Sequence, residues 1–216
     1  MEAIFIAVGA VVLIFGFVVL YGAPYLPTLA PQIDIALELV DLKDGQHLLE
    51  LGCGDGRVLI AAAEKGIQVT GYELNPILAL LAWLRTRKYN GQVKIVWGNF
   101  WRHKMPPMDG IFVFLLPRYM EKLDKKIVHD MELWSSVASE SSENPANPVV
   151  SFREPLGQEA GRLGQPKADR AKVYNGVKLV SFAFKIPDKE IAAQKEGVFL
   201  YHYQPASKSR TYQLPY

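Results

Sequence analysis

The feature that most constrains this chain is a glycine-rich loop between two apolar segments. Residues 48–60 read LLELGCGDGRVLI, with Cys53 and Asp55 standing between three glycines. The segment 47–51 before the loop is short and apolar, which is typical of a buried strand. The segment 57–65 after it is rich in alanine, which favours a helix. Because glycines permit a sharp turn and a close approach to the backbone, we predict a ligand site between a strand and a helix.

Two common phosphate-binding loops do not fit this stretch. The dinucleotide fingerprint is G-x-G-x-x-G, whereas Gly52, Gly54 and Gly56 give G-x-G-x-G, and Arg57 stands where the third glycine of the fingerprint belongs. The phosphate loop of nucleoside triphosphatases fails as well, since no Gly-Lys-Ser/Thr follows. The loop therefore favours a ligand without a phosphate at this position.

Three acidic side chains indicate the chemistry of that ligand. Glu50 and Asp55 flank the turn, where they would repel a pyrophosphate and attract positive charge. S-adenosylmethionine is such a ligand, because it carries an amino group and a sulfonium and no phosphate. Glu73 ends the next predicted strand, 67–72, at the position where nucleotide-binding sheets hold the hydroxyls of a ribose.

The remaining pattern predicts an alternating α/β fold. Further strands are predicted at 93–97 and 110–115, and a leucine- and alanine-rich helix at 76–88 has proline in its first turn. This order indicates a Rossmann-like, doubly wound sheet with its site at the carboxyl ends of the strands. Asn99, after the third strand, is placed to hydrogen-bond an adenine edge. The predicted cofactor-binding residues are Glu50, Gly52, Cys53, Gly54, Asp55, Gly56, Glu73, Asn99 and Phe100.

These motifs resemble those of class I S-adenosylmethionine-dependent methyltransferases. LELGCGDGR matches the first motif, with Glu50 replacing the commoner aspartate, and GYELNP matches the second. WGNF stands at the third motif, with Asn99 where aspartate is common. The resemblance runs from about residue 31 to residue 203. It implies a seven-stranded methyltransferase fold, S-adenosylmethionine as cofactor and methyl transfer as the activity.

The amino terminus is strongly apolar. Residues 3–20 carry no charge, and about 18 to 20 apolar residues can span a bilayer core. A signal peptide would begin with basic residues, and a buried helix of a soluble protein would show a polar face. We therefore predict a transmembrane helix at 1–22 and a proline-rich link at 23–30, before a methyltransferase domain at 31–203. Cofactor supply places that domain on the cytoplasmic side, or the matrix side in a mitochondrion. A largely apolar helix starting near Pro31 is expected to pack on the sheet edge beside the cofactor.

The order of these elements sharpens the resemblance. A membrane helix, a P-Y-x-P-T element, the motifs above and a strand ending in FLLPR resemble the membrane-anchored protein-lysine methyltransferases. Those enzymes modify the ATP synthase c-subunit and the adenine nucleotide translocase, and the bacterial members are closest in length. The resemblance implies a lysine of an integral membrane protein as substrate. It maps the pre-domain element to Pro24, Tyr25, Pro27 and Thr28.

Two alternatives to that function stay open. The site also suits a small-molecule or lipid methyltransferase that uses the anchor to reach its substrate, and a non-catalytic scaffold could keep the same cofactor fold. A lysine nucleophile must be neutral, which an apolar pocket favours. The candidate walls of that pocket follow the third and fourth strands and are Phe100, Trp101, Leu116 and Pro117. No residue stands out as a general base.

The second half of the chain contains a polar segment and two similar apolar segments. A flexible insertion is predicted at about 135–175, which is rich in serine, asparagine and proline. VVSFREP at 149–155 resembles LVSFAFKIP at 179–187. The second is the better fifth strand, since GVFLYHY at 197–203 follows as a hairpin partner. Residues 204–216 are expected to form a disordered tail.

Composition excludes several classes of partner. The net charge is +2 with mixed signs, so no nucleic-acid-binding surface is predicted. Cys53 is the only cysteine, so no intrachain disulfide is possible, and we interpret it as a small loop side chain. The four histidines lack ligand spacing, and no metal site is expected. The local basic groups are predicted to lie on solvated helix faces; they are Arg85, Arg87, Lys88, Lys122, Lys125 and Lys126.

Overall fold

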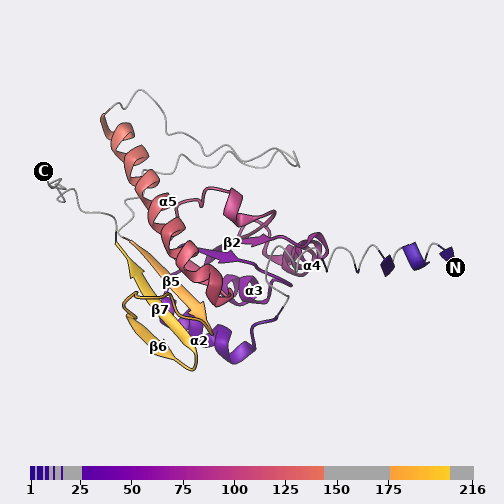
Figure 1. Cartoon of the computed structure of the whole chain (residues 1–216). Coiled ribbons are helices and arrows are strands. Elements are labelled where there is room, and N and C mark those ends of the chain that lie inside the picture. The colour runs from indigo at the N-terminus through magenta and orange to yellow at the C-terminus, as the bar shows by residue number, and fades with distance from the viewer. Residues whose placement is uncertain are drawn as a thin grey trace, which may run out of the picture.

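A single mixed sheet organises the described part of the chain. The computed structural model describes residues 1, 2, 4–6, 8, 9, 12, 16, 26–143 and 176–204. Within 26–143, side chains are described as far as residue 136. The sheet has the order β3-β2-β1-β4-β5-β7-β6 (Figure 1). Its strands are β1 (His47–Leu51), β2 (Gln68–Glu73), β3 (Val93–Trp97), β4 (Gly110–Val113), β5 (Val177–Phe182), β6 (Ala193–Lys195) and β7 (Val198–Tyr203). The predicted Rossmann-like sheet is confirmed.

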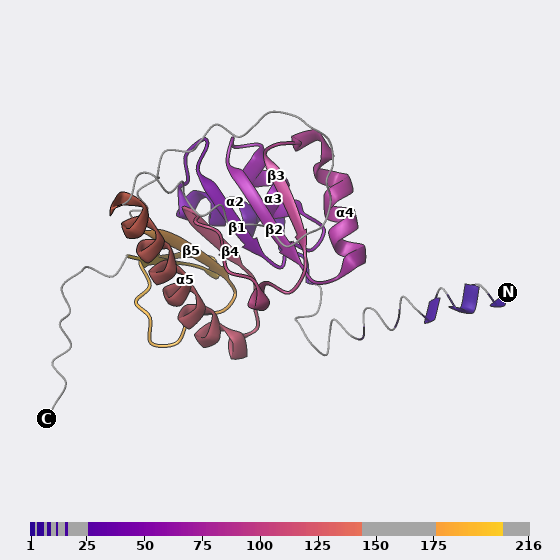
Figure 2. The ribbon, with the colours of Figure 1, turned by 90° about the horizontal axis from the view of Figure 1, so that it is seen from above.

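Helices cover both faces of the sheet. They are α2 (Ala30–Val40), α3 (Arg57–Ala63), α4 (Pro76–Thr86) and α5 (Pro117–Glu143), with short 3₁₀ turns η1 (Arg87–Tyr89) and η2 (Phe100–Arg102). Alternate strand residues face opposite layers. Helix α5 lies on one face of the sheet, and α2 and α3 lie on the other (Figure 2). On β1, Leu49 packs in the core that α5 closes, whereas Leu48 packs in the core beneath α2 and α3. Because both strand faces are buried, the central strands read as continuous apolar runs.

The strand order places a ligand crevice at one sheet edge. Strands β1 to β5 pair in parallel, so their carboxyl ends lie at the same edge. From β1 the chain winds to β2 and β3 on one side and then crosses to β4 on the other side. Ligands of open α/β sheets bind outside the carboxyl ends of the strands at such a reversal. The glycine loop follows β1 at this point.

Helix α2 differs from its predicted position. It was expected on the sheet edge, but Ile33, Leu37 and Val40 pack in the same core as Phe112 and Val180, over a face of the sheet. The reason is that α2 is buried along most of one side, and a sheet edge offers too little apolar surface to cover that side.

The carboxyl-terminal half matches one prediction and departs from another. Strand β5 is formed by the second of the two similar segments, and it pairs antiparallel with β7, as predicted. The first similar segment lies outside the described residues, as do residues 205–216 of the expected tail. Helix α5 continues to Glu143, so residues 135–143, expected in the flexible insertion, are helical. The remainder of that insertion, 144–175, also lies outside the described residues.

The predicted membrane helix falls largely outside the described residues. Of positions 1–22, the structure describes only nine, and the link residues Pro24 and Tyr25 are not among those described. Within the described residues, none of the helices combines the length and apolarity that a bilayer crossing requires. The transmembrane segment and the single-pass arrangement therefore stay predictions.

Candidate active site

The glycine loop is held over the end of β2 by backbone hydrogen bonds. The N–H groups of Gly52 and Cys53 both donate to the Tyr72 carbonyl at 2.9 Å. Gly52, Gly54 and Gly56 have φ values of 93°, 54° and 81°. Residues other than glycine rarely adopt this left-handed backbone conformation, which explains why glycines alternate along the loop. Gly56 caps α3 and packs against α4, so it shapes the loop without lining the cavity.

Gly71 lies directly beneath the loop, and sequence reasoning missed it. A Cβ at this position would stand 2.8 Å from Cys53 Cβ, 2.8 Å from Leu59 Cδ1 and 2.9 Å from Cys53 Sγ. Real Cβ atoms do not approach other atoms so closely, so the loop can reach β2 only over a glycine. A glycine inside the GYELNP strand was the available signal.

We expect Gly71→Ala to destabilise the fold by about 1–3 kcal/mol, because overpacking pushes the loop and α3 away from β2. Chemical denaturation measures the loss. Leu59→Ala removes one of the three atoms in contact, so the double variant should lose less stability than the two single variants together. If the stability losses of the two single variants are fully additive in the double variant, close packing of Leu59 against position 71 is not the cause.

Glu73 closes the loop from the end of β2. Its Oε2 accepts the Gly54 N–H at 2.8 Å, and its Oε1 accepts the Asn75 N–H at 2.8 Å. Burial raises the pKa of Glu73, and these backbone donors oppose that rise. Each carboxylate oxygen keeps a further lone pair for a ligand hydroxyl. Asn75 in turn caps α4, since its Oδ1 accepts the Ile77 N–H at 2.9 Å.

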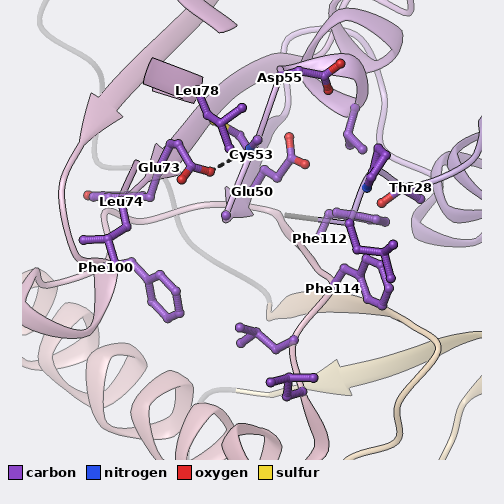
Figure 3. A pocket seen from close by; sticks show the side chains of 18 of the residues that line it. Thr28, Glu50, Cys53, Asp55, Glu73, Leu74, Leu78, Phe100, Phe112 and Phe114 are labelled. Atoms are coloured by element: carbon purple, nitrogen blue, oxygen red, sulfur yellow. Dashed lines mark hydrogen bonds between the residues drawn. The ribbon is translucent and has the colours of Figure 1, made fainter. Parts of the chain in front are cut away.

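Glu50, from β1, is the unusual group of the site. It is 4% exposed, and its Oε2 has no hydrogen-bond partner among the residues that the structure describes. Burial raises its pKa well above the ordinary range, and the negative charges of Glu73 and Asp55 raise it further. A buried carboxylate without a partner is costly unless a ligand compensates it. Figure 3 shows Glu50 and Glu73 on the same wall of the cavity. The same surroundings raise the pKa of the buried Cys53 thiol, which argues against a nucleophilic thiolate.

Asp55, a predicted cofactor-binding residue, is held by two arginines. Although burial raises its pKa, the guanidinium groups of Arg57 and Arg85 lower it overall. Asp55 accepts two bonds from Arg57, at 2.9 and 3.0 Å, and a short one from Arg85. Its carboxylate is therefore already paired with two guanidinium groups, although the residue lines the cavity. Arg85 is exposed on α4, as predicted, although it also pairs with Asp55. The prediction of solvated basic groups is wrong for Lys126, whose Nζ binds the buried Asp130 at 2.9 Å.

The pre-domain segment reaches the cavity through its second half. Pro27 and Thr28 line the cavity, and Thr28 is buried. Arg57 Nη1 donates to the Thr28 carbonyl at 3.2 Å, so the same arginine that pairs with Asp55 fixes this segment against the loop. Pro24 and Tyr25 lie outside the described residues.

Asn99 and Phe100 also line the cavity, from the turn after β3. The Asn99 Oδ1 accepts the Trp101 N–H at 3.0 Å and caps η2, which leaves its side-chain NH₂ and one lone pair of Oδ1 to bind an adenine edge. The rings of Phe100 and Trp101 lie 4.5 Å apart. Leu116 lines the cavity as well, whereas Pro117 is the first residue of α5 and does not.

Aromatic side chains form much of the remaining cavity wall. The cavity holds about 370 Å³, and Phe112, Phe114, Tyr119 and Phe184 line it besides Phe100 and Trp101. Figure 3 shows Phe100, Phe112 and Phe114 around the cavity. The Phe114 and Phe184 rings stack 6.3 Å apart. Sequence reasoning missed Phe184, which comes from the turn after β5. The available signal was that the VSFAFKIP strand ends in aromatic residues at the functional edge of the sheet.

The cavity thus combines a glycine loop, two carboxylates that pair with no cation of the described residues, and aromatic walls. Within the described residues, no group of three or more His, Cys, Asp or Glu side chains could hold a metal ion. These features suit an uncharged or cationic ligand that is bound through a ribose and stays shielded from water.

Comparison with known proteins agrees with this geometry. The family pattern of the ANTKMT methyltransferase domain matches residues 50–148. A protein-lysine N-methyltransferase of Saccharolobus islandicus (strain REY15A) is 30% identical over 124 residues, which cover 56% of this chain and 77% of that protein. The human lysine N-methyltransferase of the ATP synthase c-subunit is 32% identical over 111 residues, which cover 50% of this chain and 47% of that protein. The chain therefore spans about half the length of this human relative.

A solved structure shares the fold. The RNA methyltransferase of Salinibacter ruber, in complex with S-adenosyl-L-homocysteine, superposes with a TM-score of 0.58 at 20% identity. The match covers 83% of this chain and 94% of that one. At this identity the likeness concerns the fold and says nothing of the substrate.

Proposed function

This chain belongs to the protein-lysine methyltransferases with an ANTKMT methyltransferase domain, and we propose that it transfers a methyl group from S-adenosylmethionine to a lysine side chain. The observation that carries the proposal is the buried carboxylate of Glu50, whose Oε2 has no partner within the described part of the chain, beside Glu73 in a cavity with aromatic walls. When bound, S-adenosylmethionine supplies a methyl group already activated by its sulfonium.

The carboxylate wall suits the cofactor. Glu73 would hold the ribose hydroxyls through the lone pairs that Gly54 and Asn75 leave unused. Glu50 would compensate positive charge on the ligand, which removes the cost of its own burial. The left-handed glycines keep Cβ atoms away from the path of the ligand.

The aromatic wall suits a lysine. Phe100, Trp101, Phe114, Tyr119 and Phe184 surround the cavity without contributing a charge. Such walls exclude water and lower the pKa of an entering ammonium, so the neutral amine becomes available. Aromatic faces also stabilise the methylated cation that forms. The remaining work of the protein is to align the nucleophile with the methyl group.

The finer proposal concerns where that lysine lies. The uncharged run at 3–20 supports a membrane helix, and the proline-rich link leaves only a few residues between that helix and the cavity-lining Pro27 and Thr28. A domain on so short a tether gains effective concentration only for targets near the bilayer. We therefore propose an integral membrane protein as substrate, with the domain on the cytoplasmic or matrix side.

Transfer of a radiolabelled methyl group to isolated membranes tests both the lysine as acceptor and the membrane protein as substrate. Label should appear in protein and be recovered as methyl-lysine after hydrolysis, and Glu73→Ala should abolish most of it. Glu38→Ala, an exposed glutamate of α2 paired with Lys195 at 2.9 Å, is a matched control that should retain transfer. Label confined to the lipid extract would overturn the lysine assignment. Label in soluble proteins alone would overturn the membrane substrate.

A further inference from the structure

Helix α4 is apolar on both of its faces. Its inner face buries Leu78, Ala79 and Ala82 against the sheet and α3. Its outer face exposes Ile77, Leu80, Leu81, Trp83 and Leu84, with exposed fractions between 38% and 56%. Surface helices normally carry polar residues on the outer side, and helices that are apolar all round occur where a second apolar medium covers them.

Trp97 extends this surface to the cavity. It ends β3, the edge strand that α4 covers, and it is 68% exposed. Its Nε1 donates to the Leu74 carbonyl at 3.2 Å, and Leu74 lines the cavity together with Asn99 and Phe100. We define the α4 face as Ile77, Leu80, Leu81, Trp83, Leu84 and Trp97.

The segment that carries the α4 face contains only basic charges, two of which have acidic neighbours from outside it. Residues 75–98 contain Arg85, Arg87, Lys88 and Lys94 and no acidic residue. Arg87 lies over the Trp83 ring, 5.2 Å from its centroid, so a cation stands at the border of the apolar surface. Arg85 pairs with Asp55, and Lys88 lies 3.9 Å from Glu64 of the neighbouring element.

We propose that the α4 face lies in the headgroup region of an anionic bilayer. Leucine side chains and tryptophans beside a basic rim are the composition of interfacial helices, and tryptophan indoles prefer the boundary between acyl chains and headgroups. Basic side chains are drawn to the anionic lipids beneath them. The proposed amino-terminal anchor would hold the same domain at the same surface. The choice of a bilayer as the medium that covers the α4 face rests on the proposed placement of the domain at a membrane.

Docking by this face orients the catalytic cavity. Leu78 of α4 lines the cavity on the inner side of the helix that carries the α4 face, and Trp97 contacts the cavity wall. Contact with lipid would therefore bring the cavity within a side chain's length of the headgroups. The face selects substrates by depth, since a lysine far above the bilayer would not meet the cavity.

Tryptophan quenching by brominated lipids tests the docking without methyl transfer. The full chain is reconstituted in vesicles of phosphatidylcholine and phosphatidylglycerol, with bromine near the top of the acyl chains. Fluorescence should be strongly quenched, and the double variant Trp83→Phe with Trp97→Phe should lose most of the quenching. The matched control Trp101→Phe, which changes an indole of the cavity wall, should retain it. The readout is local, so insertion of another segment cannot imitate it.

Other results would overturn the proposal. Equal quenching in the double variant and the control would mean that the α4 face does not meet lipid. Absence of quenching in lipid, followed by a blue shift of Trp83 and Trp97 when membrane proteins are added, would assign the face to a protein partner. Unchanged quenching in vesicles of phosphatidylcholine alone would remove the role of the basic rim. Because the vesicles are prepared without S-adenosylmethionine, docking and catalysis can fail separately.

Discussion

Replacing Glu73 by alanine should weaken S-adenosylmethionine binding by about 10- to 100-fold, equivalent to about 1–3 kcal/mol. The ribose hydroxyls would lose a charged acceptor. The Gly54 and Asn75 N–H groups, each donating at 2.8 Å, would also lose their partner inside the fold. Buried donors without a partner are costly, so thermal stability should fall as well. Titration calorimetry and thermal denaturation measure the two effects.

Glu73→Gln is the matched control for this prediction. Glutamine keeps the size and one acceptor oxygen, so it can satisfy one of the two backbone donors. Its affinity for the cofactor should lie between those of the wild type and the alanine variant. Unchanged affinity in a folded Glu73→Ala protein would show that the ligand does not bind at the end of β2.

The local part of this site was predictable because neighbours in sequence create it. The glycine loop stands between β1 and α3, and Glu73 ends β2, so strand ends alone place Glu50 and Glu73 at one sheet edge. The choice of 179–187 over 149–155 as the fifth strand also followed from a local cue, the hairpin partner that became β7.

The errors concern pairs that are distant in sequence. Asp55 and Arg85 are 30 residues apart, and no local pattern indicates that α4 returns its arginine to the loop. The resulting ion pair engages Asp55, whereas Oε2 of Glu50 has no hydrogen-bond partner among the described residues. Phe184 reaches the cavity because β5 adds beside β4, a long-range pairing that periodicity does not encode. The sequence likewise predicted an apolar, buried helix at α2. It did not indicate that this helix covers a face of the sheet.

Affinity for S-adenosylmethionine should rise with pH over the range where Glu50 titrates. In the ligand-free protein, burial and then the charges of Glu73 and Asp55 raise the pKa of Glu50 well above its ordinary value. A cationic ligand favours the ionised carboxylate, so binding releases a proton. The gain in affinity should approach about tenfold per pH unit between the pKa of Glu50 in the ligand-bound protein and its pKa in the ligand-free protein. Above the ligand-free pKa, affinity should no longer rise with pH. Calorimetry in buffers of different ionisation enthalpy measures the released proton directly.

Glu50→Gln isolates this coupling. Glutamine has no proton to release, so the pH slope should flatten, and affinity at high pH should fall below that of the wild type. The ligand-free wild type should lose stability as pH rises from the ordinary glutamate pKa to the raised one, because the unfolded chain ionises first. Glu50→Gln should show a smaller loss, with the remainder coming from Glu73, whose pKa burial also raises. Asp55→Asn is the contrasting variant. Despite burial, the Arg57 and Arg85 guanidinium groups hold the pKa of Asp55 below its ordinary value, so Asp55 titrates at more acidic pH. The rise of cofactor affinity with pH should therefore persist in this variant. An unchanged slope in Glu50→Gln would mean that the ligand's positive charge is compensated elsewhere.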